Sequence, residues 1–128
     1  MKNYILDTHT LLWFLNGDRL LSDNVKKLIE QKENKIYLSI ASIWEIAIKI
    51  SIKKLKHDKG FEHLLHLLKV NEIEILEINT NHLAKVIDLE FIHKDPFDRL
   101  IIAQGITENL TILTKDRHIK NYKVNTIW

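Results

Sequence analysis

The feature that most constrains the fold is a set of short Ile- and Leu-rich runs separated by longer segments with helical periodicity. Apolar runs this short are typical of strands buried on both faces of a parallel sheet. Strands that alternate with helices predict an α/β fold with a central, mostly parallel sheet. The predicted strands cover residues 3–6, 35–38, 73–78, 110–113 and, as an edge strand, 124–128; the predicted helices cover residues 8–15, 22–32, 42–54, 61–70, 79–90 and 95–108.

Length and composition narrow the class of protein. A chain of 128 residues, 45% of them hydrophobic, predicts one domain, residues 1–128, with its own core. The net charge of +2 excludes a polycation or an acidic disordered tail. The absence of cysteine excludes disulfides, zinc ribbons and thiol catalysis, so oxygen or histidine must hold any metal. With no signal peptide or membrane span in the sequence, we expect a cytoplasmic protein without a membrane partner.

Four acidic residues occupy related places in this pattern. Asp7 directly follows the first predicted strand, and Asp116 follows the fourth. Glu45 lies one helical turn beyond the second strand, and Asp98 lies in the first turn of the helix that begins at Pro96. Because ligands of open parallel sheets bind beyond the carboxyl ends of the strands, we expect the four carboxylates to gather at one edge.

Each of these acids also has an explanation as a helix cap. Asp7 and Asp116 would each cap the turn that follows, and residues 42–45 (Ser-Ile-Trp-Glu) match a capping box. Asp95 before Pro96 is a common helix start, with Asp98 at the third helical position. Capping does not require the four acids to converge. A converged cluster would need a compensating cation, and Mg²⁺ or Mn²⁺ is the hard, oxygen-seeking choice.

Four sequence motifs surround these acids. They are Asp-Thr-His-Thr-Leu-Leu-Trp at 7–13, Ser-Ile-Trp-Glu-Ile-Ala-Ile-Lys at 42–49, His-Lys-Asp-Pro-Phe-Asp-Arg-Leu-Ile-Ile-Ala-Gln at 93–104 and Thr-Lys-Asp at 114–116. Together they resemble the motifs of the PIN-domain nucleases, in particular the VapC-like toxins. The resemblance spans the whole chain, and the motifs occur in the family's order.

The resemblance implies a three-layer α/β/α fold with strand order 3-2-1-4-5. It also implies an endoribonuclease that uses Mg²⁺ or Mn²⁺ and is the toxin of a toxin–antitoxin pair. The implied partners are a cognate antitoxin, an RNA substrate and a second copy of the chain in a homodimer. The matching positions that would bind metal and catalyse phosphodiester hydrolysis are Asp7, Glu45, Asp98 and Asp116.

A second group of residues surrounds these acids. Asp95 is either an N-cap or a further metal ligand, and Thr8 and Thr114 either cap strand ends or orient the acids. The RNA-binding candidates are the basic residues nearest the motifs, with a solvated helix end or a salt bridge as the competing roles. They are Lys49, Lys53, Arg99 and Lys115. Trp13 and Trp44 have apolar neighbours that favour packing over base stacking.

Two other functions are compatible with parts of this pattern. A phosphatase of the haloacid-dehalogenase type also begins with an Asp after its first strand, but it requires a second Asp where this chain has His9. A non-catalytic PIN module that binds RNA or protein is the other alternative, and the intact set of acids argues against it.

Overall fold

The predicted strands form one five-stranded sheet in the order β3-β2-β1-β4-β5, with every neighbouring pair parallel. The structure is a computed structural model that describes residues 2–56 and 59–128. The fold class and the strand order expected from the sequence are therefore confirmed. The strands are β1 (Asn3–Leu6), β2 (Lys35–Ser39), β3 (Ile73–Leu76), β4 (Thr111–Leu113) and β5 (Thr126–Ile127).

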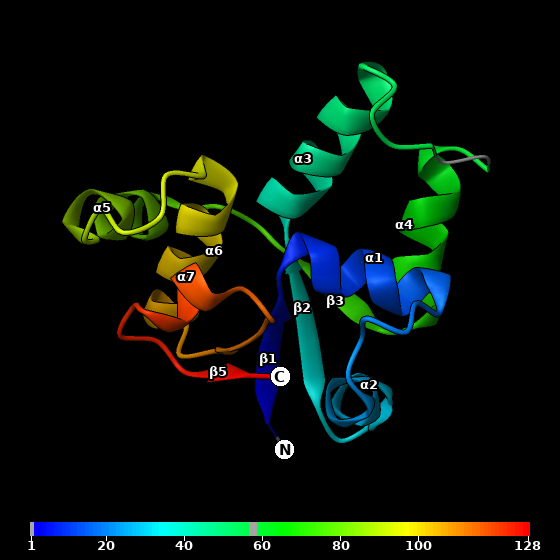
Figure 1. The fold of residues 1–128 in the computed structure, drawn as a ribbon, viewed down its shortest axis with the longest axis horizontal. Coiled ribbons are helices and arrows are strands. Elements are labelled where there is room, and N and C mark those ends of the chain that lie inside the picture. Colours follow the sequence, from blue (N-terminus) through cyan, green and yellow to red (C-terminus); the bar gives the residue numbers. More distant parts are fainter. Residues whose placement is uncertain (1, 57–58) are drawn as a thin grey trace.

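Helices cover both faces of this sheet and give a three-layer α/β/α arrangement (Figure 1). Helices α1, α2 and α4 lie on one side, and α5, α6 and α7 lie on the other, while α3 extends beyond the end of β2. The helices are α1 (Thr8–Asn16), α2 (Asp23–Glu30), α3 (Ile40–Ser51), α4 (Phe61–Val70), α5 (Thr80–Asp88), α6 (Pro96–Thr107) and α7 (Arg117–Lys120). None of the helices in the described part of the chain has the length and apolar character needed to cross a membrane.

Successive side chains of β1 point to opposite faces of the sheet and are buried on both of them. Tyr4 and Leu6 join the cluster under α1, α2, α3 and α4, whereas Ile5 joins the cluster under α6 and α7. A strand buried on both faces explains why its sequence is apolar throughout instead of alternating. The two cores hold β1 rigidly at the centre of the sheet.

Several element boundaries differ from the sequence prediction, among them those of α3, β3 and β5. Helix α3 begins at Ile40, not at residue 42, because the Ser39 hydroxyl accepts the Ala41 N–H as N-cap. It ends at Ser51, and Lys53 follows with φ of 60°, so Lys53 does not continue the helical stripe that residues 42–54 predicted. Strands β3 and β5 are shorter than the apolar patterns at 73–78 and 124–128. The four-residue helix α7 was not predicted.

The chain order reverses between β1 and β4, because β2 and β3 extend the sheet on one side and β5 on the other. In an open parallel sheet such a switch point leaves a crevice at the carboxyl ends of the strands. Leu6 and Leu113 are partners across the β1–β4 pair, so Asp7 and Thr114, the residues that follow them, lie together at this edge.

Replacing Ile102 by Ala should lower the free energy of unfolding by about 2–5 kcal/mol, because the side chain is fully buried between α6 and the sheet and its loss leaves a cavity. Ile87→Ala is the matched control, since Ile87 on α5 is 83% exposed and its loss should change stability by less than about 0.5 kcal/mol. Urea unfolding followed by circular dichroism measures both. Equal effects of the two substitutions would contradict the assignment of Ile102 to the core.

Candidate active site

Asp7 joins β1, α1 and β4 through its two carboxylate oxygens. As the N-cap of α1 it accepts the Thr10 N–H at Oδ1 (2.8 Å), and its Oδ2 accepts the Thr114 hydroxyl. The residue is only 5% exposed. Burial raises the pKa of Asp7, and the hydrogen bonds from Thr114 and Thr10 act in the opposite direction.

Asp116 likewise caps a helix and faces the site. Its Oδ1 accepts the backbone N–H groups of His118 (2.7 Å) and Ile119 (3.3 Å) at the start of α7. Its own N–H donates to Thr114 Oγ1 (3.0 Å). Thr114 therefore links Asp7 to Asp116. Of the two roles predicted for Thr114, these contacts fit the one of orienting the acids.

Glu45 enters the site from α3. Its carboxylate is largely buried, with Oε1 2.7 Å from Thr8 Oγ1 and Oε2 3.3 Å from Lys49 Nζ. The Thr8 hydroxyl also lies 2.9 Å from Ser42 Oγ. Ser42 is inside α3 and not at its start, so the capping-box interpretation of residues 42–45 is wrong. Thr8 orients Glu45 instead.

Asp98 lies in the first turn of α6. Asp95 is the N-cap of this helix and accepts the Asp98 N–H at Oδ1 (3.0 Å), as the Asp-Pro pair predicts. Burial, together with the negative charges of Asp95, Asp7 and Glu45, raises the pKa of Asp98 to about 7, and His93 partly opposes the shift. Acids from β1, α3 and α6 are therefore near enough to repel one another.

The sequence places His93 near Asp98 and favours a structural role for it over a substrate contact, whereas the structure places it among the acids of the site. Its Nε2 lies 2.8 Å from Asp98 Oδ2 and 3.6 Å from Asp116 Oδ2. Its Nδ1 accepts the Asp95 N–H (3.3 Å), and its own backbone N–H donates to the Tyr122 hydroxyl (2.7 Å). The available signal was its position two residues before the Asp95-Pro96 helix start.

The donor set fits a divalent metal. One ligand atom each from His93, Asp98 and Asp116 lies within 4.8 Å of the others. Among the described residues, the buried His93 Nε2 has no partner in hydrogen-bond geometry, despite its short distance to Asp98. After burial, the negative charges of Asp95, Asp7 and Glu45 contribute to the raised pKa of Asp98. Asp7 and Glu45 are outside this group of three, although their charges act on Asp98.

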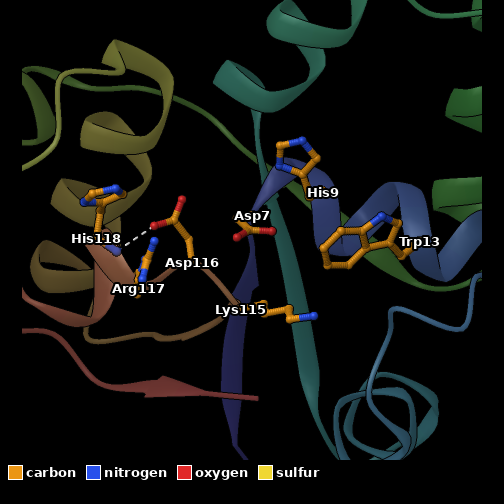
Figure 2. A pocket seen from close by; sticks show the side chains of 7 residues that line it. All are labelled: Asp7, His9, Trp13, Lys115, Asp116, Arg117 and His118. Atoms are coloured by element: carbon orange, nitrogen blue, oxygen red, sulfur yellow. Dashed lines mark hydrogen bonds between the residues drawn. The ribbon is translucent and has the colours of Figure 1, made fainter.

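A cleft of about 540 Å³ opens beside these carboxylates. Figure 2 shows Asp7 between two groups of side chains: His9 and Trp13 project from α1, and Arg117 and His118 come from α7. The residues that line the cleft are Asp7, His9, Trp13, Lys115, Asp116, Arg117 and His118. The sequence indicated Lys115 as an RNA contact, and its exposed side chain lies in this cleft.

In the described part of the chain, Arg99 fits neither of the roles expected from the sequence, an RNA contact or a salt bridge with a neighbouring acid. The residue is buried, and its guanidinium donates to the carbonyls of Glu90 (3.0 Å) and Val86 (3.1 Å). It also lies over the Phe91 ring, 4.8 Å from the ring centroid. Arg99 holds the segment between α5 and α6, so the proposed RNA contact is withdrawn.

The comparisons with known proteins agree with this architecture. The sequence model of the PIN domain family matches residues 4–125. The chain belongs to the PIN domain family. No curated protein matches it by sequence search.

Several solved structures share this PIN fold. VapBC2 from Rickettsia felis, bound to a DNA fragment from its promoter, has a TM-score of 0.74 at 20% identity, covering 98% of this chain and 97% of that chain. A Klebsiella pneumoniae toxin–antitoxin complex has a TM-score of 0.67 at 15% identity, and VapBC-1 from nontypeable Haemophilus influenzae has 0.67 at 13%. Each of these two matches covers 98% of this chain and 96% of the other. At such identities the likeness concerns the fold.

The metal-free PIN domain should lose stability as the pH rises from about 4 to about 7. Asp98 has a folded pKa of about 7, above its ordinary value of 3.8, so the folded state binds more protons than the unfolded state in this window. Asp98→Asn should reduce this slope and raise stability at pH 8 by up to about 4 kcal/mol, because the shift is about three pKa units at about 1.4 kcal/mol each. Urea unfolding in EDTA across the pH range measures it. Parallel curves for the two proteins would contradict the shift.

Proposed function

We propose that this PIN domain is a metal-dependent endoribonuclease that hydrolyses RNA phosphodiester bonds. The observation that carries the proposal is the set of carboxylates from β1, α3, α6 and the end of β4 at one edge of the sheet. Burial, together with the negative charges of the neighbouring acids, raises the pKa of Asp98, as expected of a site that is completed by a cation.

Asp98 and Asp116, with His93, would hold Mg²⁺, with Mn²⁺ as the alternative, and Asp7 and Glu45 would act as further ligands, directly or through water. When bound, such a metal lowers the pKa of water and neutralises phosphate charge. Thr114 and Thr8 keep the carboxylates of Asp7 and Glu45 in place. Asp95 caps α6 and adds negative charge beside Asp98.

Basic residues around this edge would hold the RNA backbone. Lys49 is one turn from Glu45 on α3 and pairs with it at 3.3 Å, so its ammonium is beside the acids before any phosphate arrives. Lys115 lies in the cleft. Lys53 is exposed beyond the end of α3 and would contact a more distant phosphate.

The solved structures also suggest a biological role. They include a toxin–antitoxin complex from Klebsiella pneumoniae and VapBC proteins from two other bacteria. We extend this to a toxin that acts on cytoplasmic RNA, binds a cognate antitoxin and forms a homodimer. The family match removes the phosphatase alternative. A PIN module that binds RNA or protein without cutting it is the remaining alternative, and the carboxylate set favours the enzyme.

Asp7→Asn and Asp98→Asn should each abolish metal-dependent RNA cleavage and leave the protein folded. Asn retains a side-chain oxygen that can accept the Thr10 N–H at the start of α1, but it removes the negative charge that binds a cation. EDTA should stop cleavage by the wild type without lowering its Tm. Gel analysis of RNA products in Mg²⁺ and in Mn²⁺, with circular dichroism, gives the result.

Asp88→Asn is the matched control, because Asp88 is exposed on α5 and should be as active as the wild type. Cleavage at the wild-type rate by a folded Asp98→Asn protein would refute the assignment of the acids. Unfolding on addition of EDTA would instead indicate a structural metal.

Lys49→Ala should weaken RNA binding and reduce the slope of log affinity against log salt by about 0.7, the value for one lost phosphate contact on a single strand. Lys35→Ala is the control, because Lys35 is exposed at the amino end of β2, the opposite edge of the sheet. Fluorescence anisotropy with the Asp98→Asn protein over a salt series measures both. Identical slopes for Lys49→Ala and Lys35→Ala would show that Lys49 serves only as the ion-pair partner of Glu45.

A further inference from the structure

One wall of the cleft consists of aromatic side chains that pack against a further aromatic residue. His9 and Trp13 are four residues apart on α1, so they project on the same side of the helix, with ring centroids 5.8 Å apart and an interplanar angle of 34°. The edge of Trp128, which follows β5, meets Trp13 at 5.8 Å and 69°. Trp13 is partly buried and packs against the core, yet it also lines the cleft. Its orientation is therefore fixed by neighbours on two sides.

The rest of the cleft has the charges that an RNA strand requires. Asp7 and Asp116 lie between the aromatic wall and the basic residues of α7, Arg117 and His118 (Figure 2). Lys115 projects from the loop after β4 into the same cleft. A phosphate near the carboxylates thus has the aromatic surface on one side and the Arg117 guanidinium on the other, with Lys115 in the same cleft.

We propose that Trp13, flanked by His9, is a stacking platform for one nucleobase of single-stranded RNA, next to the phosphate that is cut. The inference rests on the proposed function and adds to it a residue that contacts a base. A flat indole fixed beside a phosphate site is the arrangement by which proteins bind unpaired bases without sequence readout. Bases inside a duplex keep their faces covered by stacking, so the platform selects single strands and loops.

Trp44 provides an internal comparison. It is 60% exposed and contacts the Phe97 ring edge-on at 5.3 Å, but it is absent from the residues that line the cleft. An exposed tryptophan is therefore not sufficient for the assignment. What distinguishes Trp13 is its position in the cleft that also contains Asp7 and Asp116.

The test compares two probes of equal length and charge, a short oligoadenylate RNA and an abasic ribose-phosphate oligomer. Binding to the cleavage-inactive Asp98→Asn protein is measured by anisotropy. Trp13→Leu, which keeps an apolar side chain against the core, should weaken oligoadenylate binding about tenfold or more and leave abasic binding unchanged. Trp13→Phe should retain most of the affinity, and Trp44→Leu should match the parent for both probes.

Each outcome bears on the proposal. If folded Trp13→Leu binds oligoadenylate as tightly as its parent, or weakens both probes equally, Trp13 is not a base platform. If Trp13→Leu does not fold, the affinities of Trp13→Phe and of the parent protein for the two probes are compared instead. Equal binding of both probes by the parent protein overturns the inference. Cleavage of RNA by the wild-type protein, measured in parallel, separates the nuclease function from the stacking role of Trp13. If the wild type cleaves RNA but the parent binds both probes equally, the nuclease assignment stands and only the stacking role is refuted. Absence of both cleavage and binding removes both.

Discussion

The central constraint in this structure is the buried carboxylate of Asp7 at the switch point of the sheet. One oxygen accepts a backbone N–H of α1, and the other accepts the hydroxyl of Thr114 at the end of β4. These contacts join the two strands between which the chain order reverses. They also hold the carboxyl group in a place where burial raises its pKa, and the hydrophobic clusters on both faces of β1 keep this place rigid.

Capping and site formation are combined in the same side chains. Asp7 uses Oδ1 as a cap and directs Oδ2 to Thr114; Asp116 uses Oδ1 as a cap and places Oδ2 near His93. A capping bond fixes the rotamer of an acid, so the second oxygen is presented in a defined direction. For these two residues, capping a helix is therefore compatible with the proposed role in the site. Glu45 is the exception, because it does not take part in a helix cap.

Much of this arrangement is readable from the sequence because it depends on local signals. Buried parallel strands require short apolar runs, and Asp95-Pro96 marks the start of α6 with Asp98 in its first turn. The start of α3 is harder to predict because Ser39 and Ser42 are both suitable caps in one apolar stretch. Arg99 could not be placed from its neighbours in sequence, since its partners are carbonyls exposed by the end of α5. The contacts of His93 with His118 on α7 and of Trp13 with Trp128 after β5 join segments far apart in the chain, so no local pattern predicts them.

The junction between β2 and α3 has no intervening loop: Ser39 ends the strand and caps the helix whose first residue is Ile40. The rotational phase of α3 is therefore set directly by the sheet. One inserted residue would turn the helix by about 100° and carry Glu45 and Lys49 together away from Thr8. Length variation at this junction is consequently incompatible with the site, even if every side chain in it were retained.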